Sequence, residues 1–353
     1  MAVTGAVLGL LAVLLSLVAI VSYQWVSLAP RLGIRTLYHL RKIRIAVAVT
    51  ALMLAVMAKR RADGDSGWVY LGTVLALTPL SGALHASKTL VPLDHPEHVD
   101  ATEATIDDDS MVIGVEVDGQ AHAWLVRTLI PHHIVHDTVS GRPVIAAWCA
   151  VCNSGLVFNG IVEGRSLHFD PEAVWRRNMV MRDRETGTLW QHFTGEALVG
   201  PLEDSQLDVL GGRLMTWEAW TEDHPGTTLT RDTTADEWEG LFSKDFTREF
   251  LLDGAGRDFA SRGLGGVTAT DDRLGMLTEV IGIEVEGHAK AYPIDRLQER
   301  GRVDDEVGGV PVTVTFDSEG NRADVSVAGQ SKTFKRTRWL DWFEFHPNTA
   351  VYQ

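Results

Sequence analysis

Val112-Ile-Gly-Val-Glu-Val-Asp-Gly-Gln-Ala-His-Ala-Trp124 recurs later in the chain as Val280-Ile-Gly-Ile-Glu-Val-Glu-Gly-His-Ala-Lys-Ala-Tyr292. The two stretches align at a constant offset of 168 residues, and the match continues without a gap to Trp148 and Phe316, with 15 identities in 37 positions. Such self-similarity indicates two copies of one module, and we expect both to form the same strands. The Asp-Gly and Glu-Gly pairs between alternating apolar residues predict that each copy opens with a β-hairpin.

Short strand patterns, Gly-rich turns and few long helical patterns follow in both copies. We therefore expect a mainly β fold of two hairpin-rich modules, each of barrel or sandwich type. The first module would occupy residues 88–235, and residues 236–353 would hold a linker and the second module.

Features that both copies share are interpreted as scaffold. Trp217-x-x-Trp220-x-x-x-His224-Pro225 recurs as Trp339-x-x-Trp342-x-x-x-His346-Pro347. A histidine that recurs in a copy without cysteines needs no ligand role, so we expect both histidines to be structural.

Residues present only in the first copy are the candidates for function. Cys149 and Cys152, the only cysteines of the chain, stand where the second copy has Asp317 and Gly320. The first copy also has an insertion of 43 residues, roughly Asp170 to Met215. Three histidines are likewise absent from the second copy: His132, His133 and His136.

The Cys-x-x-Cys pair admits three interpretations: a redox dithiol, half of a metal site, or two small buried side chains. An apolar strand precedes it, and a turn and a second strand, Leu156 to Val162, follow it. A thioredoxin-type motif needs a long helix after the cysteines. The predicted hairpin tip is instead typical of metal knuckles, so the sequence favours a metal site.

The insertion is dense in charged and hydrogen-bonding side chains. It is either a solvated β-hairpin or a lid over the cysteines in which four side chains face a ligand. In the second case we expect it to contact the cysteine hairpin and to leave the second copy largely alone. The four side chains are Asp183, Arg184, Gln191 and His192.

The first 87 residues predict a membrane region. Three apolar runs, about 6–27, 44–58 and 67–87, suggest about three transmembrane helices and a lipid bilayer as partner. Basic residues are more numerous in the first loop than in the second, which favours a cytoplasmic location for the C-terminal region.

The remainder of the chain is strongly acidic. Since 8 of the 32 basic and 2 of the 47 acidic residues lie in the first 87 positions, residues 88–353 carry 24 basic and 45 acidic side chains. Such a surface repels nucleic acid. Only 7 of the basic residues are Lys, and we interpret this balance as a sign of a halophilic source.

Three motifs together resemble the family known as domain of unknown function 3179, over about residues 112–353. They are Cys149-x-x-Cys152-Asn-Ser-Gly-Leu-Val-Phe158, Met179-Val-Met-x-Asp183-Arg184-x-Thr186-x-x-Leu189-Trp190-Gln191 and Trp217-x-x-Trp220. The family pattern of a His followed by Glu-Ile-Val-Asn-Asp is matched by His132 and Asp137, whereas His133, His136 and Ala150-Val151 depart from it. The resemblance implies roles for His132, Asp137 and both cysteines. It also implies an exported or membrane-anchored domain outside the cytoplasm, against the loop charges.

The leading hypothesis is a metal site with Cys149, Cys152, His132 and one further histidine. Sulfur and imidazole ligands suit copper, zinc or iron. Three protein ligands would make a metal-dependent (redox) enzyme, and four would make a metal-handling protein. The candidates for the further ligand are His136, His168 and His192.

Two other functions remain open. One is a thiol–disulfide oxidoreductase that uses the same cysteines. The other is a non-catalytic sensor or binding module on a membrane anchor. In an enzyme, the catalytic residues would surround a small-molecule or metal ligand, and they would be His132, Asp137, Asp183, Arg184 and Gln191.

Overall fold

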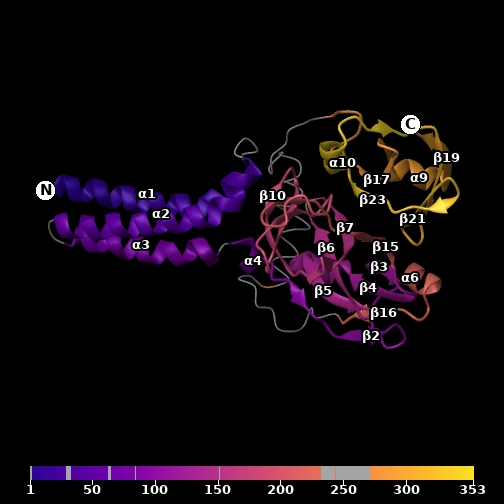
Figure 1. Cartoon of the computed structure of the whole chain (residues 1–353), viewed down its shortest axis with the longest axis horizontal. Coiled ribbons are helices and arrows are strands. Elements are labelled where there is room, and N and C mark those ends of the chain that lie inside the picture. The colour runs from indigo at the N-terminus through magenta and orange to yellow at the C-terminus, as the bar shows by residue number, and fades with distance from the viewer. Residues whose placement is uncertain are drawn as a thin grey trace. The chain divides into compact units, whose positions relative to one another are not determined.

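The computed structural model describes residues 2–28, 33–62, 65–83, 85–150, 152–231, 243 and 271–353. The chain divides into two compact units, Met1–Thr89 and Leu90–Gln353 (Figure 1). Most of the predicted linker after residue 236 lies outside the described residues.

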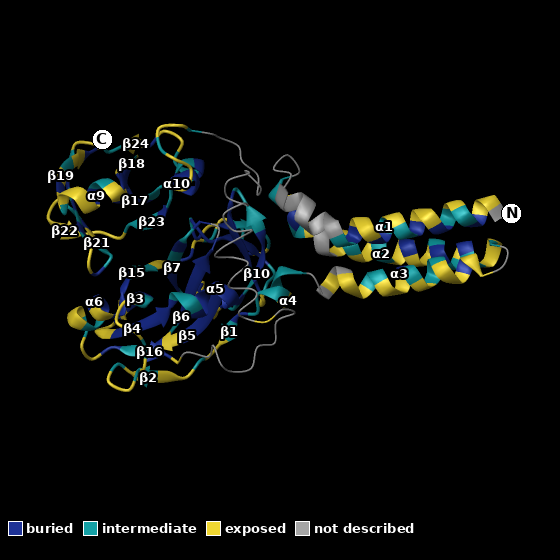
Figure 2. Cartoon of the chain, turned by 180° about the vertical axis from the view of Figure 1, so that it is seen from behind, coloured by how far each residue is buried: buried dark blue, intermediate teal, exposed yellow. Residues whose placement is uncertain are grey.

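The N-terminal unit is a bundle of three long helices followed by one helical turn. The bundle interior contains small side chains, among them Ala12, Ala51 and Ala55, which let the helices approach closely. Outward-facing positions of the bundle are largely exposed or half-buried (Figure 2). The helices are α1 (Ala2–Leu28), α2 (Ile34–Arg61), α3 (Ser66–Ala83) and α4 (Ala86–Thr89).

Of the three expected membrane spans, only the first corresponds to a described helix with the length and apolar composition of a span. Among the described residues, one helix is long and apolar enough to cross a membrane, with its window at Val3–Ile20. The apolar part of α3, Ser66–Leu80, is shorter. The second predicted span is part of a single 28-residue helix, and basic residues towards both of its ends leave only its middle apolar.

The first copy forms two sheets. Its first hairpin pairs from Val112↔Leu125 to Val117↔Gln120 and lies in a sheet of order β15-β3-β4-β16-β2. Its second hairpin continues into a third strand, in a sheet of order β1-β5-β6-β7-β14. The strands are β1 (Leu93–Asp94), β2 (His98–Asp100), β3 (Met111–Val117), β4 (Gln120–Leu125), β5 (Ile134–Val139), β6 (Arg142–Cys149), β7 (Ser154–Asn159), β14 (Val209–Gly211), β15 (Arg213–Thr216) and β16 (Thr228–Thr230), with helices α5 (Val126–His132) and α6 (Trp217–Asp223).

The second copy also forms two sheets, of order β23-β17-β18-β24 and β19-β20-β21-β22. Its elements are β17 (Glu279–Val285), β18 (His288–Pro293), α9 (Ile294–Arg300), β19 (Arg302–Val307), β20 (Val310–Asp317), β21 (Arg322–Val327), β22 (Gln330–Ser331), β23 (Lys335–Arg338), α10 (Trp339–Phe345) and β24 (Ala350–Val351).

The insertion forms a fifth sheet of order β10-β11-β12-β13, next in sequence to a two-stranded ribbon, β8-β9. These strands are β8 (Ile161–Val162), β9 (Arg165–Ser166), β10 (Phe169–Trp175), β11 (Asn178–Asp183), β12 (Leu189–Gln191) and β13 (Ala197–Val199).

The predicted fold of two barrel or sandwich modules is wrong. The fold is mixed α/β, and its five sheets of four or five strands resemble the arrangement of a five-bladed β-propeller. Neither copy closes on itself, because its two hairpins build separate sheets. The buried faces then pack across sheets: one core cluster joins Phe158 of β7, Met181 of β11 and Leu340 of α10.

The expectation that the two copies share their strands is confirmed. Val112↔Leu125 in the first copy corresponds to Val280↔Pro293 in the second, and Ile134↔Ala147 corresponds to Arg302↔Thr315. The match extends to the parallel strand pair in the first sheet of each copy. This pair joins His122 to Thr228 in the first copy and Lys290 to Ala350 in the second.

In each copy, a tryptophan of the short helix packs directly on a glycine of the first hairpin. A Cβ added to Gly114 would overlap the Trp220 ring, and one added to Gly282 would overlap the Trp342 ring. The same tryptophans stack on the two recurring histidines, with ring centroids 4.0 Å apart in both copies. These contacts support the structural role predicted for both histidines.

Each copy docks the tip of its second hairpin on the short helix of the other copy. The Arg338 N–H at the start of α10 donates to the Cys152 carbonyl oxygen at 3.1 Å, and the Thr216 N–H at the start of α6 donates to the Gly320 carbonyl oxygen at 3.0 Å. We call this pair of contacts the reciprocal docking. It makes the two copies one folding unit.

The glycine–tryptophan contacts predict matched effects in the two copies. Gly114→Ala and Gly282→Ala should each destabilise the full-length protein by about 1–3 kcal/mol, because the added methyl group overpacks a filled site. Gly226→Ala is the control, since nothing lies within 4 Å of its added Cβ. The measurement is the unfolding midpoint, and an unchanged midpoint in either test variant would contradict the close packing of glycine and tryptophan.

Candidate functional site

The two cysteines lie at the tip of the hairpin formed by β6 and β7. Cys149 pairs with Ser154 across the hairpin, and Asn153 turns the chain with a φ of 51°. Cys149 and Cys152 form a disulfide with their Cα atoms 5.4 Å apart. The residues are only 2% and 0% exposed. The hairpin placement predicted from the sequence is therefore confirmed.

One side chain of the insertion contacts the disulfide directly. The Asn178 Nδ2–H donates to Cys152 Sγ at 2.8 Å. The amide is fixed in this orientation because its Oδ1 accepts from Gln191 Nε2 at 3.0 Å and from the Phe193 N–H at 2.9 Å. Gln191, a predicted site residue, thus acts on the cysteine pair through Asn178.

The expected contact pattern of the insertion is only half right. The insertion contacts the cysteine hairpin through Asn178, but it also packs on the second copy. Arg176 Nε donates to Glu344 Oε1 at 3.0 Å, and Phe193 stacks on Phe345 with ring centroids 4.5 Å apart. The insertion sheet therefore bridges the cysteine hairpin and α10.

Two buried ionisable residues lie in α10 and in the insertion. Asp341 of α10 is fully buried, and burial raises the pKa of its carboxyl to about 8 although the charges of Arg338 and Arg177 act to lower it. Among the described residues, neither Asp341 oxygen has a hydrogen-bond partner. Arg177 is also buried, and burial lowers the pKa of its guanidinium. Such a group of unsatisfied buried polar atoms is uncommon in a folded protein and marks a candidate functional site.

The repeat relates Asp341 to the cysteine hairpin. Gly320 and Ala219 are the equivalents of Cys152 and Asp341, and a Cβ added to Gly320 would lie 2.8 Å from the Ala219 Cβ. Because the two dockings are equivalent, we expect position 152 to face position 341 in the same way. Leu340 supports this placement, since it shares a buried cluster with both cysteines.

The predicted ligand His132 is buried, and its Nδ1 lies 2.7 Å from the Val91 carbonyl oxygen. His192 lies nearer the cysteine strand, with its Nε2 3.2 Å from the Ala147 carbonyl oxygen. Burial lowers the pKa of His192 to about 4, so its ring is neutral at pH 7.

Two other predicted ligands lie in a separate group with Arg184. His136 Nδ1 lies 2.6 Å from Asp94 Oδ1, and its Nε2 accepts from the Phe169 N–H at 2.7 Å. His168 Nδ1 lies 2.8 Å from Glu185 Oε1. Arg184 bonds Asp94 at 2.6 Å and also Asp170. These contacts tie the insertion to β1 and β5.

The predicted catalytic residue Asp183 organises a turn. Its carboxylate accepts from the N–H groups of Thr186 and Gly187 and from Trp190 Nε1 at 2.9 Å. This explains the Asp-x-x-Thr-Gly pattern, because a buried carboxylate needs such donors.

The predicted site residue Asp137 belongs to another cluster, in which Asp137 and His122 are buried and His98 is exposed, and which we call the His98–His122–Asp137 group. His98 Nε2 lies 2.6 Å from Asp137 Oδ1, and His122 Nε2 lies 3.4 Å from Asp137 Oδ2. Trp124 Nε1 donates to Oδ2 at 2.8 Å. The two imidazoles hold the pKa of Asp137 well below its usual range, and burial lowers the pKa of His122.

The His98–His122–Asp137 group could hold a metal ion, because one ligand atom from each residue lies within 4.8 Å of the others. Among the described residues, this is the only group of His, Cys, Asp or Glu side chains that meets this geometry. The predicted set around Cys149, Cys152 and His132 is not the one that the structure assembles. Sequence reasoning missed both histidines of the group, although His122 stands opposite a lysine, Lys290, in the repeat alignment.

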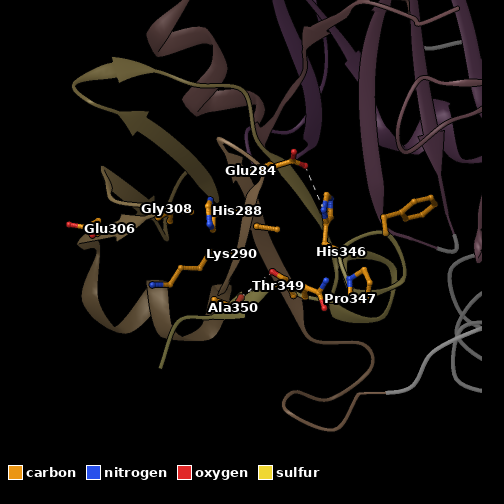
Figure 3. Close-up of a pocket in the computed structure, with 14 residues that line it drawn as sticks. Glu284, His288, Lys290, Glu306, Gly308, His346, Pro347, Thr349 and Ala350 are labelled. Carbon is orange, nitrogen blue, oxygen red and sulfur yellow. Dashed lines mark hydrogen bonds and ion pairs between the residues drawn. The ribbon is translucent and has the colours of Figure 1, made fainter. Parts of the chain in front are cut away.

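A cavity of about 460 Å³ lies in the second copy, away from the cysteines. Figure 3 shows Glu284, His288, Lys290 and His346 among the residues that line it. His346 is 3.7 Å from Glu284. Because these charged groups are largely paired, the cavity shows no convergent set of reactive groups.

Asp341 predicts a pH dependence of stability. Between pH of about 4 and 8, the folded protein keeps a proton that the unfolded chain, with an ordinary pKa of 3.8, has released. The free energy of unfolding should therefore fall as pH rises in this window, by at most about 1.4 kcal/mol per pH unit for this one group. Asp341→Asn should flatten the decline, whereas Asp272→Asn at an exposed position should not. Identical pH profiles for all three proteins would contradict the assignment.

Comparison with known proteins places the chain in a family. No curated protein and no solved structure matches it. The sequence model of one family, described as a protein of unknown function (DUF3179), matches residues 90–339, which is more than half of the chain and includes the cysteine hairpin, the insertion and the His98–His122–Asp137 group. The chain therefore belongs to the DUF3179 family.

Proposed function

We propose that the Leu90–Gln353 unit is a thiol–disulfide redox protein whose working group is the Cys149–Cys152 couple. The observation that carries the proposal is the buried Asn178 amide aimed at Cys152 Sγ from 2.8 Å. A hydrogen-bond donor held at a sulfur stabilises a thiolate much more than it stabilises a disulfide. Cys152 is therefore the better leaving group of the pair, and Cys149 is the sulfur to be attacked.

The exchange uses a partner dithiol as reductant. One partner thiolate bonds to Cys149 Sγ, the Cys149–Cys152 bond breaks, and its electron pair goes to Cys152 Sγ, where the Asn178 N–H holds the charge. The second partner thiolate then attacks the mixed disulfide and releases Cys149. The partner dithiol becomes a disulfide, and the two cysteines gain two electrons and the two protons that the partner lost.

Burial limits the choice of partner. With both cysteines almost fully buried, a globular surface cannot bring its thiolate to Cys149 Sγ. The suitable reductant is a small dithiol, or a dithiol on a flexible arm, that enters as the hairpin tip separates from α10.

The disulfide also bears on location. Lasting disulfides suit oxidising compartments, so the proposal favours the extracytoplasmic side of a cell membrane, as the family resemblance implies and against the charges of the loops. Retained as an anchor, the apolar helix α1 would hold the redox unit at that membrane.

The metal-site hypothesis for the same cysteines has less support. It needs imidazole nitrogens gathered around two thiolates, and two of the predicted ligands, His132 and His192, bond backbone carbonyl oxygens through one ring nitrogen each. The sensor hypothesis has no observation of its own in its favour.

The test is a redox titration of untagged full-length protein in detergent. The protein is equilibrated with mixtures of reduced and oxidised dithiothreitol, and free thiols are then alkylated and counted by mass spectrometry. We expect both cysteines to convert together and reversibly. Asn178→Ala should make the midpoint potential more negative by about 15–30 mV, a three- to tenfold change in the equilibrium constant.

Gln206→Ala is the matched control, because it removes an amide of the same insertion that bonds only backbone oxygens. A pair that resists reduction until the protein unfolds would identify the disulfide as structural. Free thiols that carry one equivalent of copper, zinc or iron would establish the metal-site hypothesis instead.

A further inference from the structure

The second copy shows what the scaffold holds at the position of the His98–His122–Asp137 group. His122, Trp124 and Asp137 correspond to Lys290, Tyr292 and Asp305. Lys290 Nζ lies 2.6 Å from Asp305 Oδ2, and the Tyr292 hydroxyl donates to the same oxygen at 3.0 Å. The second copy thus places a permanent cation beside its carboxylate.

The first copy keeps the carboxylate but lacks the permanent cation. Asp137 is buried, and its carboxylate lies 2.6 Å from His98 Nε2 and 3.4 Å from His122 Nε2. The fully buried His122 takes the place of the lysine. A buried carboxylate beside two imidazoles offers the oxygen and nitrogen ligands that a transition-metal ion binds.

An additional strand brings a second imidazole to the same carboxylate. The first sheet of the first copy has five strands, whereas its equivalent in the second copy has four. The extra strand is β2, which pairs with β16 at the edge of the sheet and carries His98. The His98 side chain is 27% exposed, so water reaches the group from this side.

We infer that the first copy binds a divalent transition-metal ion of the zinc type through Nε2 of His98, Nε2 of His122 and a carboxylate oxygen of Asp137. The ion stands where the second copy has the Lys290 ammonium group. Two imidazoles and one carboxylate are a common zinc ligand set, and they leave one position open to water. This site is separate from the cysteine couple and does not depend on the redox function.

The surrounding hydrogen bonds already orient the ligands. His122 Nδ1 lies 2.7 Å from Thr228 Oγ1, and its Nε2 lies 3.0 Å from Thr230 Oγ1 and 3.4 Å from Asp137 Oδ2. The Thr138 N–H donates to Asp137 Oδ1 at 2.7 Å. Such outer contacts fix the rings and carboxylates of metal sites.

Metal entry requires two local changes, of which the first is that the Thr230 hydroxyl gives up its contact with His122 Nε2. The proton between His98 Nε2 and Asp137 Oδ1 leaves, and their separation widens from 2.6 Å to about 3 Å to admit bonds of about 2.0–2.2 Å. Because His98 lies on a three-residue edge strand, this shift disturbs no central strand.

The test is the binding of Zn²⁺ and Co²⁺ to untagged, chelator-treated full-length protein. Calorimetry should give one equivalent of Zn²⁺, and Co²⁺ should produce the visible absorption of a low-coordinate nitrogen–oxygen site. His98→Ala should weaken binding at least tenfold. His122→Lys reproduces the ion pair of the second copy, so it should abolish binding and keep the unfolding midpoint at or above that of the metal-free wild type.

Two controls locate the site. The double variant Cys149→Ser, Cys152→Ser should bind Zn²⁺ as tightly as the wild type, and so should His168→Ala in the other histidine cluster. Wild-type affinity in both His98→Ala and His122→Lys would overturn the inference. If His122→Lys failed to fold, His98→Ala at the exposed edge would decide the question alone.

Discussion

The reciprocal docking is the constraint on which the rest of the structure depends. The Arg338 N–H bonds the Cys152 carbonyl oxygen, and the Thr216 N–H bonds the Gly320 carbonyl oxygen, so each copy supplies the helix start that satisfies the other copy's hairpin tip. Unpaired backbone groups at buried positions are costly. Neither copy can therefore separate without leaving such groups exposed, and two modules that look independent in sequence fold as one unit.

The same exchange explains why the cysteine site has residues from three parts of the chain. The first copy supplies Cys149 and Cys152, the insertion supplies Asn178, and the second copy supplies Arg338, whose N–H bonds the Cys152 carbonyl oxygen. In the equivalent docking a glycine meets an alanine. The proposed function therefore uses one of two symmetric contacts, and the other has a packing role.

The sequence predicted the parts of this arrangement that local signals determine. The Asp118-Gly119 turn and the constant offset between the two copies were sufficient to predict the hairpins, their register and the position of the cysteines at a hairpin tip. The pairing of sheets was missed, because it depends on long-range packing that no turn signal reports. Asn178 was also missed, since an amide in a polar insertion carries no sign of the sulfur it contacts. His98 lies on a strand of three residues outside the repeat, whereas His122 could have been found from the lysine opposite it.

The central proposal is that the cysteine pair is a redox couple, and it lies at one of two equivalent dockings, so we expect its reduction to loosen that docking alone. Hydrogen–deuterium exchange of the full-length protein, oxidised and reduced, tests it most directly, because residues 216–223 serve as the internal control for residues 338–345. Reduction should accelerate amide exchange in 338–345, where the Arg338 N–H bonds the Cys152 carbonyl oxygen, and leave 216–223 unchanged. Equal acceleration in both segments, or none in either, would contradict the account.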